Sequence, residues 1–217
     1  MSKKRIMPDT ASIANVGSGG KLHAPSAERN GAAILEALQG VLPESGKALE
    51  IASGTGQHVL GLAARFVNIT WQPTEVEPER IASIEAWRRE AGLQNILPPV
   101  LMDASEAGWS ARHSGQNVIF FSNLLHLISD TEAEMVITEA AKALASAGVL
   151  AVYGPFMRGE RFASEGDQRF HESLRAQDAD IGYKAVGWVQ MAQKTAGLSV
   201  LEPISMPANN LILVARK

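Results

Sequence analysis

The chain has 217 residues, a net charge of −3 and a pI near 6.0, so it has no overall basic field that would attract nucleic acid. It contains no cysteine, which excludes disulfides, thiolate zinc ligands and a cysteine nucleophile and fits a reducing compartment. Hydrophobic residues make up 46% of the chain, yet no stretch approaches the roughly 18 apolar residues of a membrane span. We therefore expect a cytoplasmic globular protein without a membrane partner.

The first 22 residues lack apolar periodicity and end in Gly17-Ser18-Gly19-Gly20. This composition predicts a mobile N-terminal segment, residues 1–22, unless the segment becomes ordered over a ligand. The basic run Lys3-Lys4-Arg5 is followed by no apolar stretch and is not a secretory signal. We expect the remaining residues, 23–217, to form a single domain.

Apolar runs typical of strands alternate with helical patterns along this domain. The expected helices cover residues 26–42, 57–66, 78–91, 131–147, 168–177 and 188–195, and the expected strands cover residues 47–51, 69–75, 96–102, 117–122, 149–153, 198–205 and 210–215. The alternation predicts an α/β fold, a Rossmann-like three-layer sandwich. Its seven-stranded, mostly parallel sheet would end in a C-terminal antiparallel hairpin.

Several residues mark where these elements should begin and end. Ser26 is the expected N-cap of the first helix, and Asp130 or Thr131 should cap the fourth, with Glu134 at the capping-box position. Gly148 should end that fourth helix.

Prolines and asparagines mark other boundaries. We expect Pro73 to end regular pairing of the second strand, and Pro98-Pro99 to disturb the third. Asn209-Asn210 should form the turn of the hairpin, because asparagine tolerates a positive φ.

A glycine turn follows the first strand of the domain. In the stretch Glu50-Ile51-Ala52-Ser53-Gly54-Thr55-Gly56-Gln57, two glycines allow a tight turn and close approach of a ligand to the backbone. The helix that begins near Gln57 presents free N–H groups at its positive end. Val59 occupies the place of the third glycine in a dinucleotide fingerprint, which disfavours an NAD-dependent oxidoreductase.

Polar residues also follow the next strands along the chain. Glu75, with Glu77 as a competitor two residues later, ends the second strand, and Asp103 and Asn123 follow the third and fourth. Ligands of such sheets bind outside the carboxyl ends of the strands, so we expect these side chains to surround one nucleotide-like ligand.

The glycine turn and these acids together resemble the class I S-adenosylmethionine-dependent methyltransferases. From about Ala24 to the C-terminus, the chain also resembles the little-characterised group that contains methyltransferase-like protein 26. The strings that carry this second resemblance are Arg29-Asn30, Leu49-Glu50-Ile51-Ala52-Ser53-Gly54-Thr55-Gly56, Trp71-Gln72-Pro73, Ala82-Ser83-Ile84-Glu85-Ala86-Trp87, Tyr153-Gly154-Pro155-Phe156 and Met206-Pro207-Ala208-Asn209-Asn210-Leu211.

The resemblance implies S-adenosylmethionine as cofactor and S-adenosylhomocysteine as product. Glu50 would hold the methionyl ammonium, Glu75 would accept from the ribose hydroxyls, and Asp103 would accept from the adenine amino group. A carboxylate suits the ribose because it only accepts hydrogen bonds. The whole implied cofactor set is Arg29, Asn30, Glu50, Ala52, Gly54, Thr55, Gly56, Glu75, Val76, Asp103, Ala104 and Asn123.

The implied catalytic residues are Asn123, His126 and Tyr153. His126 is either a general base for a hydroxyl acceptor or a hydrogen-bonded histidine inside an apolar run. Tyr153 either lines the acceptor pocket or packs at the edge of the core. Asn123 is followed by Leu124-Leu125-His126 instead of the Pro-Pro-aromatic motif of amino-methylating enzymes, which disfavours that type of N-methylation.

Two further features leave alternatives open. Arg29 and Asn30 belong either to a lid over the cofactor and substrate or to a solvated helix start. The five histidines lack the spacing of a metal site, and we expect His58 and His113 to be solvent-facing or loop residues.

The sequence thus predicts a methyltransferase that acts on a small-molecule acceptor. An S-adenosylmethionine-binding protein without methyl transfer is the alternative. Neither the acceptor nor the oligomeric state is predicted.

Overall fold

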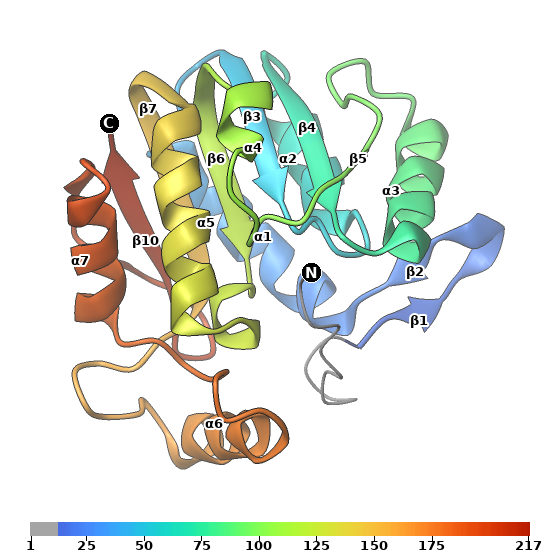
Figure 1. The fold of residues 1–217 in the computed structure, drawn as a ribbon. Helices are drawn as coiled ribbons and strands as arrows, with labels where there is room; N and C mark the ends of the chain where they lie inside the picture. The colour runs from blue at the N-terminus through green and yellow to red at the C-terminus, as the bar shows by residue number, and fades with distance from the viewer. Residues whose placement is uncertain (1–12) are drawn as a thin grey trace.

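The computed structural model describes residues 13–217 and contains a central sheet between two layers of helices (Figure 1). Eight strands form the sheet: β3 (Gly46–Ile51), β4 (Ile69–Glu75), β5 (Val100–Leu101), β6 (Gln116–Ser122), β7 (Leu144–Pro155), β8 (Ser199–Val200), β9 (Ile204–Ser205) and β10 (Asn210–Arg216). Their order is β5-β4-β3-β6-β7-β10-β8, with β9 paired to β10, and β10 runs antiparallel to its neighbours. The predicted Rossmann-like α/β fold is confirmed.

Strand β3 lies between its sequence neighbour β4 and the distant strand β6. Ala48 pairs with Trp71 on one side and with Val118 on the other, and both pairings are parallel. The chain therefore reverses its direction of progress across the sheet at β3, which is where ligands bind in such folds. The carboxyl ends of β3, β4 and β6 meet at one edge, referred to below as the carboxyl edge.

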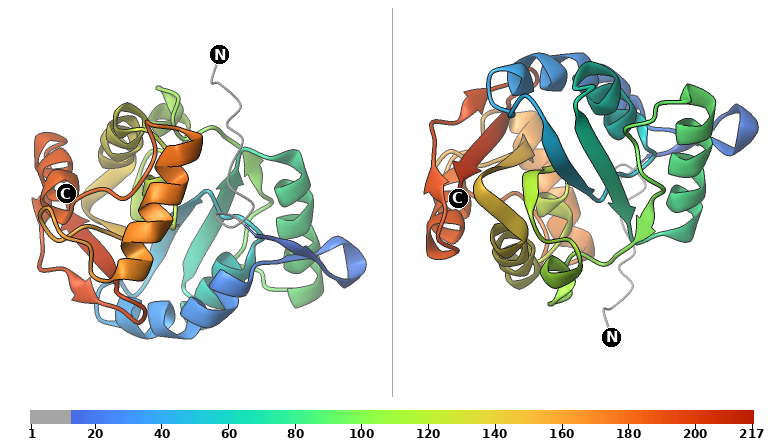
Figure 2. Two further views of the ribbon diagram at one scale, coloured as in Figure 1. Left: turned by 90° about the horizontal axis from the view of Figure 1, so that it is seen from below. Right: turned by 90° about the horizontal axis from the view of Figure 1, so that it is seen from above.

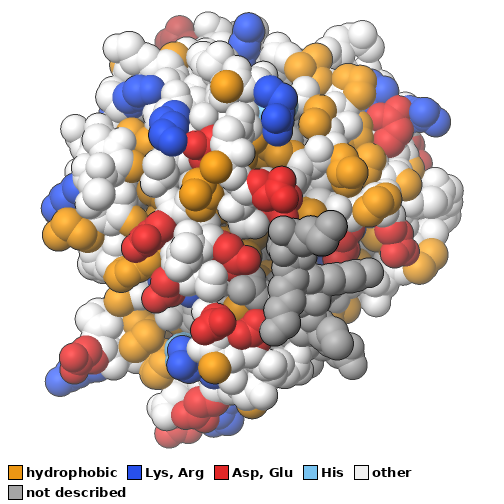
Figure 3. Space-filling view, in the orientation of Figure 1, with side chains coloured by type: hydrophobic (Ala, Val, Ile, Leu, Met, Phe, Trp, Pro, Cys, Tyr) orange, Lys and Arg blue, Asp and Glu red, His pale blue; other side chains and the backbone are white. Residues whose placement is uncertain are grey.

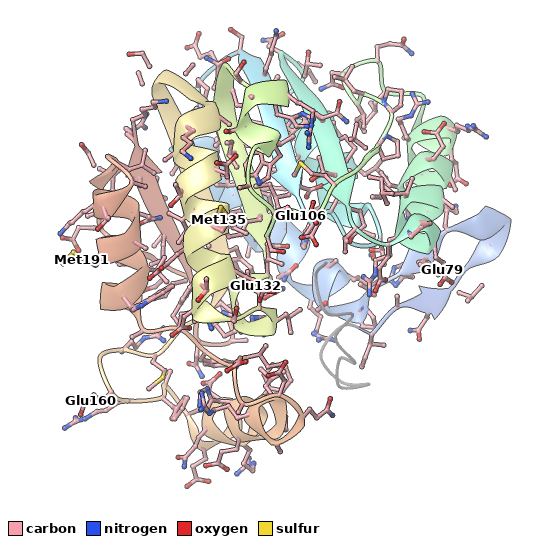
Figure 4. The ribbon with its side chains drawn as sticks, in the orientation of Figure 1. Glu79, Glu106, Glu132, Met135, Glu160 and Met191 are labelled. Atoms are coloured by element: carbon pink, nitrogen blue, oxygen red, sulfur yellow. The ribbon has the colours of Figure 1, made fainter. Side chains whose placement is uncertain are left out.

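The helices cover the sheet in two layers (Figure 2). Helices α1 (Pro25–Gln39), α2 (Gln57–Arg65) and α3 (Pro78–Ala91) cover one face, and α4 (Trp109–Arg112), α5 (Asp130–Ala143) and α7 (Val186–Thr195) cover the other. Side chains of β6 alternate between the two layers: Val118 and Phe120 pack with α1 and α2, whereas Ile119 and Phe121 pack with α5. Met191 projects outward from α7 (Figure 4) and is 61% exposed.

Two segments lie beyond the carboxyl edge. Helix α6 (Glu165–Gln177) lies below the sheet in Figure 1. Strands β1 (Asn15–Val16) and β2 (Leu22–His23) form an antiparallel hairpin with a short 3₁₀ turn η1 (Ser18–Gly20) at its tip, and this hairpin packs on α3. The predicted mobile segment thus falls partly on residues 1–12, which lie outside the described part, and partly on this hairpin.

Several helix boundaries differ from the predictions. Helix α1 starts at Pro25 with Ala24 as N-cap, so Ser26 lies inside the helix, which ends at Gln39 with Gly40 as C-cap. Helix α5 is capped by Ser129: its Oγ accepts from the Glu132 N–H, and Glu132 Oε2 accepts from the Ser129 N–H at 2.8 Å. The predicted cap at Asp130 or Thr131 with Glu134 was wrong, although the motif type was correct.

Gly148 lies inside β7 and does not end α5, which stops at Ala143. A Cβ at Gly148 would lie 2.9 Å from the Gln116 carbonyl oxygen, so glycine is required there by the close approach of β7 to β6. Helix α6 starts three residues earlier than expected because Ser164 caps it and accepts from the Asp167 N–H.

The prediction at Pro73 holds for one neighbouring strand only. The pairing of β4 with β3 ends at Pro73, opposite Glu50, but the strand continues to Glu75 because Thr74 and Glu75 pair with Val100 and Leu101 of β5. The third predicted strand shortens to β5, as the two prolines before it suggested. The expected strand 198–205 divides into β8 and β9, which raises the strand count from seven to eight.

The hairpin turn before β10 contains Ala208 and Asn209 at positive φ, whereas Asn210 already belongs to the strand. Within the described range, no helix combines the length and the apolar character needed to cross a membrane.

Candidate cofactor and acceptor site

The glycine turn connects β3 to α2 through a run of positive-φ residues. Ala52 has a φ of 52°, Gly54 of 59° and Gly56 of 96°. A Cβ at Gly56 would lie 3.0 Å from the Ile84 Cα, so close packing against α3 also requires glycine there. At Gly54 the nearest atom to a Cβ would be the Arg80 guanidinium at 3.6 Å, so the space above this residue is open to a ligand.

Glu50 brings a buried carboxyl group to the carboxyl edge. The residue is 2% exposed, and its Oε2 receives no hydrogen bond from any residue in the described range. Burial raises the pKa of Glu50 to about 8, a hydrogen bond from Ser53 opposes this shift, and the nearby Glu75 adds to it. Unpartnered buried oxygens are rare in proteins. The Glu50 carboxyl group is therefore suited to bind a hydrogen-bond donor or a cationic group of a ligand.

Glu75 lies at the end of β4 and contacts the glycine turn directly. Its two oxygens accept from the Gly54 and Val76 N–H groups, each at 2.8 Å. Burial raises its pKa. A carboxylate accepts about four hydrogen bonds, so two N–H donors leave capacity for ligand hydroxyls. The competitor Glu77 instead forms a 2.8 Å ion pair with Arg80, and its side chain is 59% exposed.

Asp103 and Ala104 follow β5 and lie beside the end of β4, because the Met102 N–H donates to the Glu75 carbonyl oxygen. Asp103 Oδ1 accepts from the Ser105 N–H and hydroxyl, and the Ala104 carbonyl accepts from the Trp109 indole N–H at 3.0 Å. These bonds fix the turn that presents both residues. Glu106, in the same turn, projects at the front of the molecule (Figure 4).

The ends of β6 and β7 bring Asn123 and Tyr153 together. Asn123 follows β6 with a φ of 54°, and its N–H donates to the Tyr153 carbonyl oxygen at 2.9 Å. Asn123 and Ala52 are therefore two non-glycine residues at positive φ, one after each of two adjacent strands. Such residues are uncommon and often occur at functional sites.

A polar network joins this region to α1 and α2. His58, in the first turn of α2, lies 2.8 Å from Asn30 Oδ1 through Nε2 and 3.1 Å from the Ser122 hydroxyl through Nδ1. Burial raises the pKa of Tyr153, and a hydrogen bond from Asn30 opposes this shift. The surrounding protein lowers the pKa of His58 to about 4, although part of the residue still reaches solvent.

His58 was therefore wrongly expected to be a solvent or loop residue. It is a helix residue held by two polar side chains, and the sequence signal for it was its place directly after the glycine turn. Arg29, one residue before Asn30, is exposed on the second turn of α1.

His126 lies in a separate environment, in the 3₁₀ turn η2 (Leu125–Leu127). The ring is buried and its centroid lies 5.9 Å from the ring centroids of Phe170 and Tyr183. Burial lowers its pKa to about 3, and the nearby Lys184 contributes to this shift. Its predicted role as a base stays a prediction. No group of three or more potential metal-binding side chains occurs within residues 13–217.

The charge distribution on one face agrees with the overall composition. Figure 3 shows several Asp and Glu side chains over the middle of this face, whereas Lys and Arg side chains are scattered over its upper and lower parts.

Comparisons with known proteins agree with this architecture. The structure is similar to an O-methyltransferase family protein from Burkholderia thailandensis, with a TM-score of 0.73, 16% identity, and coverage of 86% of this chain and 55% of that chain. A putative O-methyltransferase from Nostoc punctiforme gives a TM-score of 0.74 at 17% identity, with coverage of 85% of this chain and 55% of that chain. Human N-acetylserotonin methyltransferase, in complex with S-adenosylmethionine, gives a TM-score of 0.72 at 13% identity. The match covers 88% of this chain and 52% of that chain.

The chain therefore has the fold of S-adenosylmethionine-dependent methyltransferases, and it spans about half the length of the three proteins named above. At the level of sequence, a family model described as "Protein of unknown function (DUF938)" matches residues 21–217. The chain belongs to this family.

Proposed function

We propose that the protein is an S-adenosylmethionine-dependent methyltransferase that acts on a small-molecule acceptor. The observation that carries the proposal is the arrangement of Glu50, Glu75 and Asp103 around the glycine turn, with one buried Glu50 oxygen unpartnered. The fold shared with methyltransferases supports it. We also propose that the chain is related to the group of methyltransferase-like protein 26.

The residues present fit this cofactor. Glu50 would receive the ammonium of the methionine part, Glu75 the ribose hydroxyls and Asp103 the adenine amino group, while Gly54 leaves room for the ligand to approach. Arg29, Asn30, Ala52, Thr55, Gly56, Val76, Ala104 and Asn123 complete the proposed binding set.

The bound cofactor would supply an electrophilic methyl group on a sulfonium, which needs no activation by the protein. The residues at the ends of β6 and β7 would therefore act mainly by aligning the acceptor and by excluding water. Asn123 and Tyr153 are the proposed aligning groups. His126 is the proposed base for a hydroxyl, which requires its buried ring to become accessible to the acceptor.

Calorimetric titration with S-adenosylhomocysteine tests the binding step. We expect the unaltered protein to bind and Gly54→Ala to lose at least tenfold in affinity, because the added methyl group enters the ligand space. Gly92→Ala is the matched control: Gly92 has a φ of 65°, and no atom lies within 4 Å of its Cβ position. Equal binding by all three proteins would contradict the assigned site, and no binding by any of them would overturn the proposed function.

A binding protein without methyl transfer is the second candidate. It is favoured by the low pKa values of His58 and His126, neither of which is poised as a base near neutrality. Incubation with methyl-labelled S-adenosylmethionine and a small-molecule extract of the source cells separates the two candidates. Label that moves to an extract compound supports the enzyme, and bound cofactor without label transfer supports the binding protein.

A further inference from the structure

The N-terminal hairpin and the residue directly after it, Ala24, are tied to the glycine turn through two side chains. Ser83, in α3, accepts from the Leu22 N–H at 2.8 Å and donates to the Thr55 carbonyl oxygen at 2.8 Å. Gln57, at the start of α2, accepts from the Ala24 N–H at 2.6 Å and from the Thr55 hydroxyl at 2.9 Å. Both ties converge on Thr55, the residue between the two glycines.

Each tie is fixed by its surroundings. Ser83 is fully buried, so the loss of its hydroxyl would leave two backbone groups without a partner. Gln57 uses its amide oxygen for both bonds, so its role requires an acceptor and no donor.

The hairpin itself is held on α3 by contacts outside the turn. The Trp87 indole N–H donates to the Leu22 carbonyl oxygen at 3.0 Å. Lys21 pairs with Glu90 at 2.6 Å and lies 4.6 Å from the Trp87 ring centroid. The docking of the hairpin and the shape of the turn are therefore separate features that Ser83 and Gln57 connect.

The turn needs such support because two glycines flank Thr55. Glycine loses more backbone freedom on ordering than any other residue, so a ligand that binds a free glycine turn must also order it. The hydrogen bonds of Ser83 and Gln57 to Thr55 order the turn in advance. They therefore reduce the entropic cost of ordering it when the ligand binds.

We propose that Ser83 and Gln57 are positioning residues for the cofactor, and that they couple the docked hairpin to the affinity of the glycine turn. This inference rests on the proposed function for the identity of the ligand. By reciprocity, the cofactor must then stabilise the docked hairpin to the same extent as the hairpin strengthens cofactor binding.

Titration of purified variants with S-adenosylhomocysteine tests the coupling. We expect Ser83→Ala and Gln57→Leu each to weaken binding about tenfold, because each removes one of the two hydrogen bonds that hold Thr55. Gln57→Glu keeps both acceptor bonds and should bind within about twofold of the unaltered protein. Ser173→Ala is the matched control, because Ser173 is exposed on α6 and bonds only locally to the Phe170 carbonyl. Thermal unfolding verifies that each variant is folded.

Hydrogen exchange of single backbone amides measures whether ligand binding stabilises the docked hairpin, which binding affinity alone does not show. S-adenosylhomocysteine should slow exchange of the Leu22 and Ala24 N–H groups in the unaltered protein, and this effect should shrink in Ser83→Ala and Gln57→Leu. Without any ligand, the same variants should show faster exchange of the Gly56 N–H, which donates to the Ser53 carbonyl.

The outcomes are distinguishable. Folded variants that bind as tightly as the unaltered protein, or a ligand that leaves Leu22 and Ala24 exchange unchanged, would overturn the coupling while the proposed function stands. Failure of the unaltered protein to bind would overturn the proposed function and the coupling to this cofactor. The ligand-free exchange of Gly56 then still decides whether the hairpin orders the turn.

Discussion

Glu50 combines two properties that are unfavourable for folding: its carboxyl group is buried, and one of its oxygens is unpartnered. The folded-state pKa of about 8 exceeds the value of 4.5 for an unperturbed glutamate. Between these two pH values the unfolded chain releases the Glu50 proton and the folded chain retains it. Folding stability due to Glu50 is therefore highest below about pH 4.5 and falls as the pH rises toward 8.

Replacement of Glu50 by glutamine should expose this cost. Since each pH unit of difference corresponds to about 1.4 kcal/mol, the free energy of unfolding of Glu50→Gln relative to the unaltered protein should increase by a few kcal/mol between pH 5 and pH 8. Denaturant titrations at several pH values measure it.

The same substitution should weaken S-adenosylhomocysteine binding by tenfold or more, because the amide does not neutralise the ligand ammonium. Glu77→Gln is the control, since Glu77 is exposed and pairs with Arg80. If the difference in the free energy of unfolding between Glu50→Gln and the unaltered protein stayed constant from pH 5 to pH 8, the pKa of Glu50 would not be raised in the folded protein.

The hydrogen-bond directions around His58 follow from the chemistry of its partners. Asn30 Oδ1 only accepts, so the proton of the neutral imidazole lies on Nε2, and Nδ1 accepts from the Ser122 hydroxyl. The Asn30 amide N–H groups are then free to face Tyr153. We predict a neutral Nε2–H tautomer of His58 from pH 7 down to about pH 5.

NMR chemical shifts of the imidazole nitrogens, in protein labelled with nitrogen-15 histidine, determine this tautomer. The His58→Gln variant assigns the His58 signals. Asn30→Asp should raise the pKa of His58 by at least one unit, because a carboxylate stabilises the imidazolium. Titration near 6.5 in the unaltered protein, or an Nδ1–H tautomer, would contradict these directions.

At the residue level, the acids of the candidate site were easier to predict from the sequence than the hydrogen-bond network around it. Glu50 and Glu75 were predictable because each lies at or next to the carboxyl end of an apolar strand. His58, Ser122 and Ser83 were not, because their partners lie 28 to 64 residues away in the chain and only the fold brings them together. His58 carried one usable signal, its position in the first helical turn after the glycines.

At the level of elements, apolar periodicity predicted every long strand and every helix except the short α4. Most of the errors lie at element ends, and for α5 and α6 a single side chain decides where the helix begins. Ser129 and Ser164 cap α5 and α6 although other polar residues nearby were equally plausible caps. Gly148 was misread as a helix stop because a close strand contact and a helix end both require glycine.

At the level of the whole molecule, ligand binding should raise the thermal stability of the single domain. S-adenosylhomocysteine at about 100 times its Kd adds roughly 2.7 kcal/mol to the free energy of unfolding. For a chain of this size, that corresponds to a rise in Tm of about 5–10 °C. Thermal scans with increasing ligand measure it, and Glu50→Gln at the same ligand concentration should show a smaller rise.

The position of β3 in the sheet also has a consequence for folding kinetics. Its pairing with β4 joins residues about 23 positions apart, whereas Ala48 pairs with Val118, 70 positions later. Parallel pairings between distant segments form slowly, because loop closure precedes the contacts that reward it. We expect the β3–α2–β4–α3 half to form first and the docking of β6 to limit refolding. Until β6 docks, the apolar edge of β3 is exposed, and refolding yield should fall as protein concentration rises.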